Sequence, residues 1–372
     1  MCLAETSLPA GEISGNSAFA ERMLTTLNHG ALCLMASVGH RVGLFDAMKS
    51  APSLTSGELA SRSGLNERYV REWLGAMTAS GVVRIEPGAD ADSRDPHYRL
   101  PTEHAAFLTR GAGADNLAMF TQFIAVLGGV EDDIVECFKN GGGVPYDRFP
   151  RFHDVMAEDS DHTVVDVLES RILPLVPGLT DRLRSGIRVL DLGCGRGRAL
   201  NRLAELFPAS RFQGIDLSAK AIACARDEAS ARGLKNIEFR IADLSDYNVK
   251  AEPEAFDLIF TFDAIHDQGR PLNVLKGIHR TLKPDGVYLM QEIRGSSAPR
   301  NNISHPIGTF LYTISCMHCM TVSLAQGGEG VGAMWGEEKT REYLNQAGFS
   351  NVETRQFNQD IQNNRYIATK AV

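Results

Sequence analysis

The chain has 372 residues, of which 43% are hydrophobic and 23% charged, and its formal net charge is −8. This length exceeds what one hydrophobic core usually supports, and the acidic excess argues against nucleic acid or an anionic membrane as the main partner. The seven cysteines, an odd number, are typical of reduced thiols. No apolar run approaches the ~18 residues that cross a membrane, and the first residues do not resemble a signal peptide. We therefore expect a cytoplasmic protein of two domains that acts on a small molecule.

Residues 1–110 are predicted to form a winged-helix domain. Apolar residues recur at helical spacing over residues 18–50. The next stretch, LTSGELASRSGLNERYVREWLGAMTASGVVRI, contains a capped short helix, a turn at Gly64, a second helix capped by Asn66 and a β-rich end. After the loop EPGADADSRDPH, the segment YRL supplies the second strand of a wing.

A winged helix often binds DNA, so the charge of its second helix is informative. In NERYVREWLGAMTAS, Arg68 and Arg71 are balanced by Glu67 and Glu72, and residues 1–110 contain ten basic and twelve acidic residues. A surface that reads a DNA groove is basic. We therefore expect this domain to form a homodimer or to cover the substrate. A ligand-sensing DNA-binding regulator is the alternative from a different functional class.

Residues 111–185 are predicted to be a helical linker. The stretch ADNLAMFTQFIAVLGGVEDDIVECF is apolar on more than one face, which favours a helix held between domains, and it ends at the glycine- and proline-rich NGGGVPYDRFP. Pockets are common between domains, so the linker is expected to contribute to the substrate pocket. The side chains expected there are Phe152, His153 and Met156.

Residues 186–372 are predicted to form an α/β domain. Strand-like segments such as IRVLDLG, RFQGIDLS, IEFRIAD, AFDLIFTFDAI and VYLMQEI alternate with helical segments such as ALNRLAELF, AIACARDEASARG and PLNVLKGIHRTL. Alternation of this kind is typical of a mostly parallel sheet covered by helices on both faces. The fold class is therefore a Rossmann-like, doubly wound sheet preceded by a helical winged-helix domain.

The turn after the first strand, in VLDLGCGRGR, carries glycines at alternate positions, namely Gly193, Gly195 and Gly197. Glycine permits a positive φ and removes the Cβ atom, so a nucleoside-bearing ligand can lie against this backbone. The spacing differs from the G-x-G-x-x-G dinucleotide pattern, and no Lys-Ser/Thr pair follows. A pyrophosphate ligand is therefore not favoured.

Carboxylates mark three consecutive strands, at Asp191, Asp216 and Asp243. Asp216, at the end of the second strand, stands where an acidic group can accept hydrogen bonds from ribose hydroxyls. Asp243, at the end of the third strand, is placed to approach an adenine amino group. Three carboxylates would repel phosphates, so the pattern suits a ligand with a cationic or hydroxyl-rich body.

With these motifs, residues 186–295 resemble the class I S-adenosylmethionine-dependent methyltransferases. VLDLGCGRG, GIDLS, ADL, FDLIFTFDAIHD and LKPDGVYLMQEI stand in that family's order and spacing. The whole chain resembles more loosely the two-domain small-molecule O-methyltransferases. The resemblance implies S-adenosylmethionine as cofactor, with the methionine part near Asp191, the ribose at Asp216 and the adenine at Asp243. The residues expected at the cofactor are Asp191, Gly193, Gly195, Gly197, Asp216, Leu217, Asp243, Leu244, Phe262 and Asp263.

Methyl transfer from a sulfonium is an in-line displacement, so a hydroxyl acceptor needs alignment and a base. His266, at the end of the fourth strand, has a side chain whose ordinary pKa of ~6.5 suits that role. In the family that the chain resembles, a His-Asp pair here provides the base, which implies His266 and Asp267. Glu292 matches the family position that orients the histidine. Gln268 departs from the family, which usually has Trp at this position.

The segment YTISCMHCM contributes the remaining candidates for the substrate pocket, Tyr312, Cys316 and Cys319. Cys316, His318 and Cys319 are also residue types that bind soft metals or metalloids. No fourth ligand or second paired motif accompanies them, so no metal site is expected. We expect O-methylation of a small, fairly apolar molecule. The alternative is S-methylation of a thiol, sulfide or metalloid, in which His266 would matter less.

Overall fold

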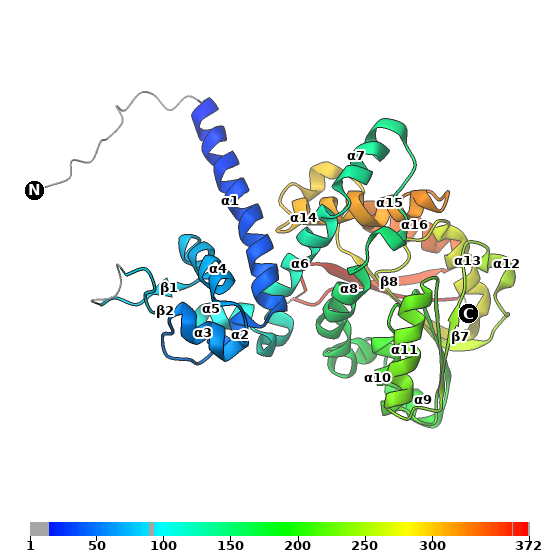
Figure 1. Ribbon diagram of the computed structural model, residues 1–372. Coiled ribbons are helices and arrows are strands. Elements are labelled where there is room, and N and C mark those ends of the chain that lie inside the picture. The colour runs from blue at the N-terminus through cyan, green and yellow to red at the C-terminus, as the bar shows by residue number, and fades with distance from the viewer. Residues whose placement is uncertain (1–14, 89–92, 359, 371–372) are drawn as a thin grey trace, which may run out of the picture. The chain divides into compact units, whose positions relative to one another are not determined.

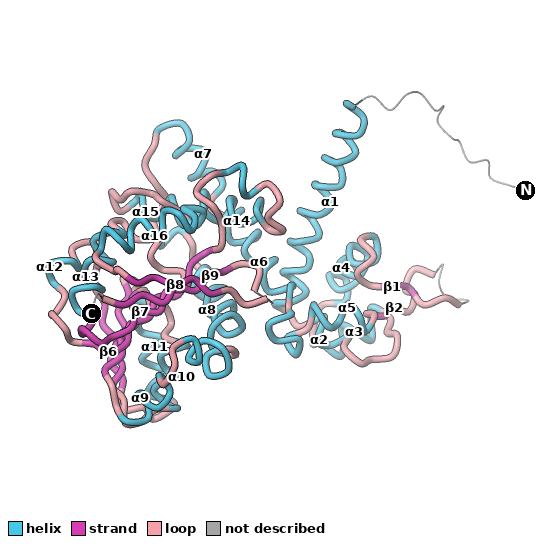
Figure 2. Tube along the Cα trace, turned by 180° about the vertical axis from the view of Figure 1, so that it is seen from behind, coloured by secondary structure: helices cyan, strands magenta, loops and turns pink. Residues whose placement is uncertain are grey.

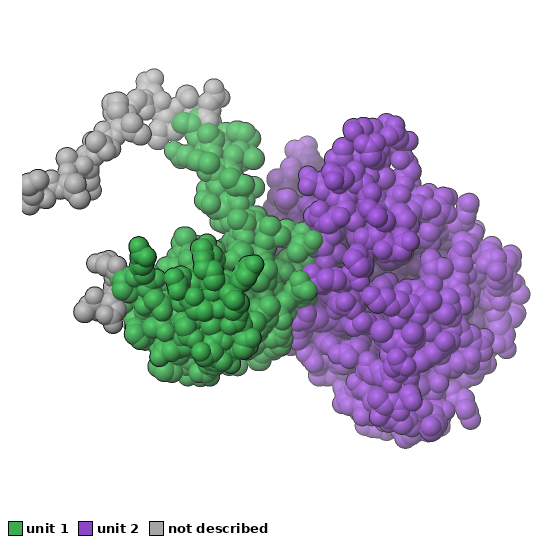
Figure 3. Space-filling model, viewed as in Figure 1, with its two compact units in different colours: residues 1–125 green, residues 126–372 purple. Residues whose placement is uncertain are grey.

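The computed structural model describes residues 15–88, 93–358 and 360–370. The chain divides into two compact units, residues 1–125 and 126–372 (Figure 3). The predicted linker, residues 111–185, is shared between both units, and the division into three parts stays a prediction. Within the described ranges, no helix combines the length and the apolar character needed to span a lipid bilayer.

The first unit contains the predicted winged helix (Figure 1). Its elements are α1 Gly15–Arg41, α2 Leu44–Met48, α3 Ser56–Ser63, α4 Glu67–Ala79, β1 Arg84–Ile85, β2 Tyr98–Arg99, α5 Thr102–Leu108 and η1 Arg110–Asp115. Thr55 caps α3 in a reciprocal capping box with Glu58, and the side chain of Asn66 caps α4. The antiparallel pair of β1 and β2 forms the wing.

The core of this unit forms around Trp73, which is buried with Phe45 edge-on to it at 5.2 Å between ring centroids. The indole N–H of Trp73 donates to the carbonyl of Met35 at 2.9 Å, which ties α4 to α1. On the outer side of α4, Arg68 and Arg71 form ion pairs of 2.6 and 2.8 Å with the glutamates four positions away, Glu72 and Glu67. The helix therefore does not present a basic face of the kind that binds DNA.

The second unit is an α/β domain with helices before and after its central sheet. Helix α6 (Leu117–Gly128) crosses the division between the units. The helical elements that follow are α7 Glu131–Asn140, η2 Tyr146–Arg148, α8 Phe152–Ser160, η3 Asp161–Val165, η4 Leu168–Ile172, η5 Leu173–Leu175, α9 Leu179–Ser185, α10 Arg198–Leu206, α11 Ala219–Ala231, α12 Tyr247–Lys250, α13 Pro271–Thr281, η6 Pro299–Asn302, α14 Gly308–Ile314, η7 Ser315–Cys319, α15 Met320–Ala325, η8 Ala333–Trp335 and α16 Gly336–Ala347.

The sheet has seven strands in the order β5-β4-β3-β6-β7-β9-β8. They are β3 Arg188–Leu192, β4 Arg211–Asp216, β5 Ile237–Ile241, β6 Phe256–Phe262, β7 Leu282–Ile293, β8 Asn351–Arg355 and β9 Asn363–Thr369. The pairs among the first five strands are parallel, whereas β9 pairs antiparallel with both β7 and β8. The predicted mostly parallel sheet is confirmed.

Helices cover both faces of this sheet, as Figure 2 shows. Neighbouring residues of one strand enter opposite cores because side chains alternate along a strand. In β6, Leu258 and Phe260 pack into one core with α9, α10 and α11, while Ile259 packs into the other core with α13 and α16. This double burial explains why the strand sequences are almost continuously apolar.

Two features differ from the sequence expectations. The apolar stretch predicted as one helix forms two, α6 and α7, because Gly128 and Gly129 interrupt it and glycine has low helix propensity. The antiparallel strands β8 and β9 were not predicted. Their residues are more polar than those of the central strands, and β8 shows an alternating burial pattern typical of a sheet edge.

Candidate active site

A cavity of about 500 Å³ lies at the carboxyl ends of β3, β4, β5 and β6. β3 lies between β4 and β6, so the strand order changes direction here, which is where open α/β sheets bind ligands. An adjoining cavity of about 90 Å³ shares Gly193 and Gly195 with the first and includes Asp191. The other predicted cofactor residues that line the larger cavity are Asp216, Leu217, Asp243, Leu244, Phe262 and Asp263. Gly197 lines neither of these two cavities.

The three glycines of the turn after β3 serve different purposes. Gly193 has φ 72°, and a Cβ there would lie 2.5 Å from the Cβ of Ala264, so it permits the close approach of the loop after β6. A Cβ on Gly197, at φ 66°, would lie 2.5 Å from the ring of Phe239, so this glycine is needed for packing. A Cβ on Gly195 would meet no atom within 4 Å. Gly195 is therefore the position where a ligand can lie against the turn.

The carboxylates at the ends of β4 and β5 are partly engaged by the backbone. Asp216 accepts hydrogen bonds from the amides of Gly195 and Ser218, each at 2.8 Å. Asp243 accepts one from the amide of Ser245 at 2.8 Å. A carboxylate offers about four acceptor positions, so both side chains keep capacity for hydroxyl or amino groups of a ligand.

Two further carboxylates in the cavity walls, Asp191 and Asp263, are held in low-dielectric surroundings. Burial, followed by the charge of Asp216, raises the pKa of Asp191 to about 8. Burial, followed by the charge of Glu292, raises the pKa of Asp263 to about 7. Asp263 also has φ 51°, a conformation that costs free energy and is concentrated at functional sites. A cation entering the cavities would favour the ionised form of both carboxyl groups.

His266, in the loop after β6, is buried between two carboxylates. Its Nδ1 forms a short hydrogen bond with Oε2 of Glu292, on β7, whose other oxygen accepts from the amide of Ile265 at 3.1 Å. Its Nε2 lies 3.2 Å from Oδ1 of Asp267. Burial by itself would lower the pKa of His266, but Glu292 and Asp267 outweigh it and raise that pKa well above 6.5.

Asp267 connects this histidine to the cavity. It lines the cavity wall, whereas His266 is not among the lining residues. Oδ2 of Asp267 accepts a hydrogen bond of 2.9 Å from the hydroxyl of Tyr146, in η2. Burial would raise the pKa of Asp267, but the positive charge of His266 holds it well below its usual range. An acceptor in the cavity therefore meets Asp267 and Tyr146 before it meets His266.

Aromatic side chains also line the larger cavity. Phe152, His153 and Met156, which the sequence placed in the substrate pocket, line the cavity, and so does Phe149. The rings of Tyr146 and His153 stack, with centroids 5.7 Å apart and planes 10° from parallel. The cavity therefore has an apolar, flat-sided part next to the candidate catalytic residues.

The remaining predicted pocket residues lie elsewhere. Tyr312 is 37% exposed, and its hydroxyl accepts a hydrogen bond from Asn302 at 2.9 Å. Cys316 is half-buried, and Cys319 is buried close to His266 and Asp267. None of the three lines the larger cavity. The sequence placed these residues on one face of a regular helix, but η7 (Ser315–Cys319) is a π-helical turn, which shifts that spacing.

Sequence reasoning missed Tyr146, Phe149 and Gln268 as wall residues. Tyr146 and Phe149 belong to the glycine- and proline-rich NGGGVPYDRFP, which was interpreted only as a break between helices. Aromatic residues in such a break were the available signal, because an apolar ring beside glycine and proline needs a partner to pack against. Gln268 was noted only as a departure from the family's usual Trp.

Comparisons with known proteins agree with this fold. Residues 183–348 match the family model described as a methyltransferase domain, and residues 30–110 match that of the Rv2258c-like winged HTH domain. The solved structure of human N-acetylserotonin methyltransferase in complex with SAM is similar over 97% of this chain and 100% of its own, with TM-score 0.65 and 18% identity. The solved structure of the mitomycin 7-O-methyltransferase MmcR is similar over 95% of this chain and 98% of its own, with TM-score 0.66 and 16% identity.

Curated proteins are also similar in sequence, and two of them overlap with the chain to different extents. Methyltransferase ungE' of Aspergillus campestris is 24% identical over 308 residues, which cover 79% of this chain and 84% of that protein. Malonyl-[acyl-carrier protein] O-methyltransferase of Bacillus cereus is 27% identical over 150 residues, 40% of this chain. The match spans about half of that second relative, 49% of its length.

The fold is that of the class I S-adenosylmethionine-dependent methyltransferases. The chain carries a methyltransferase domain at residues 183–348 after a winged-helix domain at residues 30–110, and it is a methyltransferase whose cofactor is S-adenosylmethionine.

Proposed function

We propose that this protein transfers the methyl group of S-adenosylmethionine to a hydroxyl of a small, fairly apolar molecule, with His266 as the general base. The observation that carries the proposal is the position of the His266–Asp267 pair between Glu292 and the aromatic cavity wall. In this arrangement Glu292 holds the ring through Nδ1, so Nε2 is the atom that takes part in proton transfer. Because Glu292 and Asp267 raise the pKa of His266, Nε2 first releases its own proton to solvent and then accepts the proton of the hydroxyl. Asp267 and Tyr146 position the acceptor.

The cofactor lies along the carboxyl ends of β3 to β6 in this proposal. Gly193 and Gly195 support it from the turn, Asp216 accepts hydrogen bonds from the ribose, and Asp243 with Leu244 holds the adenine. The methionine part, which carries the sulfonium and ammonium charges, lies near Asp191 and the smaller cavity. Phe262 and Asp263 complete the wall near the reacting methyl group. The support is that these side chains line the two adjoining cavities.

The test begins with the cofactor. Calorimetric titration of S-adenosylmethionine is expected to give micromolar binding that Asp216→Ala abolishes or strongly weakens, since carboxylate–hydroxyl hydrogen bonds contribute about 1.5–3 kcal/mol each. A transfer assay with labelled methyl groups against phenols, thiols and arsenite then identifies the accepting atom. Loss of phenol methylation in His266→Ala, with thiol methylation only weakened, supports the base. Equal phenol methylation in the parent and the variant contradicts it.

We also propose that the protein is a cytoplasmic homodimer formed through α1. Along this helix Phe19, Met23, Leu24 and Leu27 expose between 50% and 69% of their surfaces. Exposed apolar side chains gathered on one helix are typical of an interface. The six cysteines in the part of the chain that the structure describes are free thiols, which fits a reducing compartment.

A further inference from the structure

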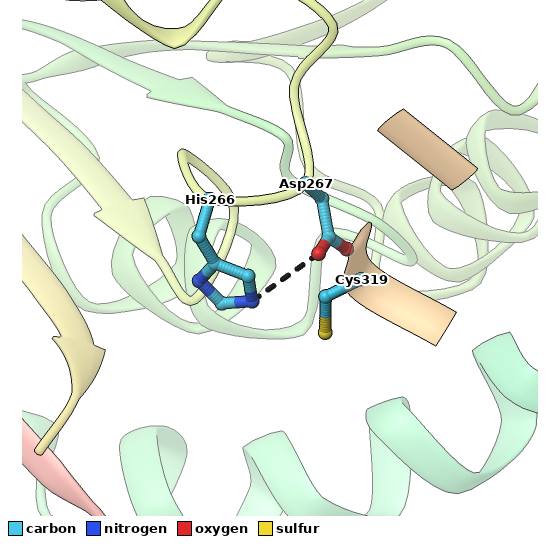
Figure 4. Close-up of side chains that lie close together, drawn as sticks. All are labelled: His266, Asp267 and Cys319. Carbon is cyan, nitrogen blue, oxygen red and sulfur yellow. Dashed lines mark ion pairs between the residues drawn. The ribbon is translucent and has the colours of Figure 1, made fainter. Parts of the chain in front are cut away.

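Three side chains from two separate segments meet beside the active site. They are His266 and Asp267, in the loop after β6, and Cys319, the last residue of η7 (Figure 4). One ligating atom from each, an imidazole nitrogen, a carboxylate oxygen and the thiol sulfur, lies within 4.8 Å of the others. All three residues are buried. The sequence alone predicted no metal here, because it placed Cys319 only with its neighbours Cys316 and His318.

The orientation of His266 suits a metal ligand. Because Nδ1 is hydrogen-bonded to Glu292, Nε2 is the nitrogen that faces Asp267. Histidines that bind metals regularly carry a carboxylate on their other ring nitrogen, which fixes the ring and makes the binding nitrogen more basic. The Glu292 carboxylate is fixed in turn by the amide of Ile265, at 3.1 Å.

A fourth donor lies at the edge of the cluster. His318 is fully buried and packs with its ring parallel to that of Phe152, with the centroids 3.4 Å apart. Among the described residues, neither of its ring nitrogens has a hydrogen-bond partner, although Nδ1 is 3.9 Å from Oδ2 of Asp267. A buried imidazole without any partner is costly, and in native proteins such a group commonly serves a ligand.

We propose that Cys319, His266 and Asp267 bind one thiophilic divalent cation of the Zn²⁺ type, with His318 as the fourth donor. Thiolate and imidazole ligands select ions of this kind over Mg²⁺ or Ca²⁺, which prefer oxygen. Ligand atoms around tetrahedral Zn²⁺ are roughly 3.5 Å apart, so the cluster must contract by about 1 Å, which side-chain rotation can supply. Binding breaks the S–H bond of Cys319 and the Nε2–H bond of the protonated His266, releases both protons to solvent and changes no oxidation state.

This site has a consequence for catalysis but does not depend on the proposed acceptor. A bound ion takes up the lone pair of His266 Nε2, which a general base needs. The metal-loaded protein therefore cannot use His266 as a base, and Zn²⁺ should inhibit any methyl transfer that requires this base. The binding itself can be measured with neither cofactor nor acceptor present, so its failure is distinguishable from failure of the proposed function.

The experiment is an anaerobic titration of the full chain, freed of metal by chelator, with Co²⁺ alone. We expect one Co²⁺ per chain, the visible bands of a tetrahedral site and a near-ultraviolet thiolate-to-cobalt charge-transfer band. Cys319→Ser should remove the charge-transfer band, whereas Cys316→Ser, three residues away in η7, should keep it. Absence of a stoichiometric complex, or a charge-transfer band that survives in Cys319→Ser, overturns the proposal.

A second variant keeps the test decisive if Cys319→Ser does not fold. Glu292→Gln retains all the proposed ligands and removes only the partner of His266 Nδ1. Loss of such an outer partner typically lowers metal affinity about 10–100-fold, so the Co²⁺ affinity should fall by that factor with the charge-transfer band retained. Unchanged affinity in folded Glu292→Gln, judged by circular dichroism, contradicts the assignment of His266 as a ligand.

Discussion

Glu292 accepts a hydrogen bond from Nδ1 of His266 at the centre of the protein's second unit, with both side chains almost completely buried. The two residues are 26 positions apart in sequence and are brought together because β6 and β7 are parallel neighbours. The pair leaves Nε2 of His266, which lies 3.2 Å from Oδ1 of Asp267, as the ring nitrogen that can take part in proton transfer. The proposed roles of this histidine depend on that orientation.

Replacing either partner of this pair should reduce the rate of methyl transfer. His266→Ala removes the base and should lower kcat for a hydroxyl acceptor about 10²–10⁴-fold. Glu292→Gln keeps the imidazole but weakens its orientation, so kcat should fall about 10²–10⁴-fold with little change in KM. Steady-state kinetics on one phenolic acceptor measure both values. A rise in KM at constant kcat would mean that the pair binds substrate and does not assist proton transfer.

The preference for S-adenosylmethionine over S-adenosylhomocysteine should depend on pH. The pKa of Asp191 is raised to about 8, so its carboxyl group is ionised above that pH and neutral below it. S-adenosylmethionine carries one more positive charge than the product, and an ionised carboxylate nearby favours it by on the order of tenfold. The dissociation constant of S-adenosylmethionine, divided by that of S-adenosylhomocysteine, should therefore rise as the pH falls from 9 to 6.5.

Asp191→Asn supplies the control for this pH effect, because the amide has a similar shape and does not titrate. Calorimetry of both ligands at each pH should give a nearly constant ratio for this variant. A ratio that changes equally in the parent and in Asp191→Asn would assign the dependence to another group, of which Asp263, with its pKa of about 7, is the nearest candidate.

Two glycines of the turn after β3 should respond differently to alanine. In Gly197→Ala the added methyl group would overlap the ring of Phe239, so the free energy of unfolding should fall by about 1–3 kcal/mol from overpacking, with further cost from the positive φ. Gly195→Ala meets open space and should cost only about 1 kcal/mol for its φ of 53°.

For cofactor binding, the order of the two variants should be the opposite of their order for stability. Gly195→Ala should weaken cofactor binding strongly, because its methyl group enters the space at the turn that the ligand needs. The folded fraction of Gly197→Ala should bind nearly as the parent does. Denaturant unfolding and calorimetry on the same samples measure both quantities, and weakened binding in Gly197→Ala alone would contradict this division of roles.

A charge placed on the exposed face of α1 should dissociate the proposed homodimer. Leu27 is chosen because it is the most exposed of the large apolar residues of this helix, at 69%. Leu27→Glu should be a monomer, as measured by light scattering coupled to size-exclusion chromatography. Tyr69→Glu is the matched control, because Tyr69 is 80% exposed on α4. A parent protein that is already monomeric at micromolar concentration would refute the dimer.

Local sequence was sufficient to predict those helices, strands and turns whose signals lie within a few neighbouring residues. The capped helices α3 and α4, the strands β3 to β7 and the glycine turn depend on caps, apolar runs and backbone freedom, which are properties of short segments. The carboxylates at the strand ends were located for the same reason, since parallel strands bring their carboxyl ends to one edge. Gly197 shows the limit of this reasoning. The sequence grouped it with the glycines of a ligand-binding turn, whereas in the structure it packs against the ring of Phe239.

What only the tertiary structure decided is which distant segments share the site. Tyr146 reaches Asp267 across 121 positions, and Cys319 reaches His266 through the packing of η7 against the loop after β6. No periodicity or cap encodes such a contact, because it results from the burial of apolar faces by elements far apart in the chain. The sequence by itself therefore determined the proposed cofactor side of the site, which is built from consecutive strand ends. The acceptor wall and the Cys319 cluster were decided by how the helices before and after the sheet close over it.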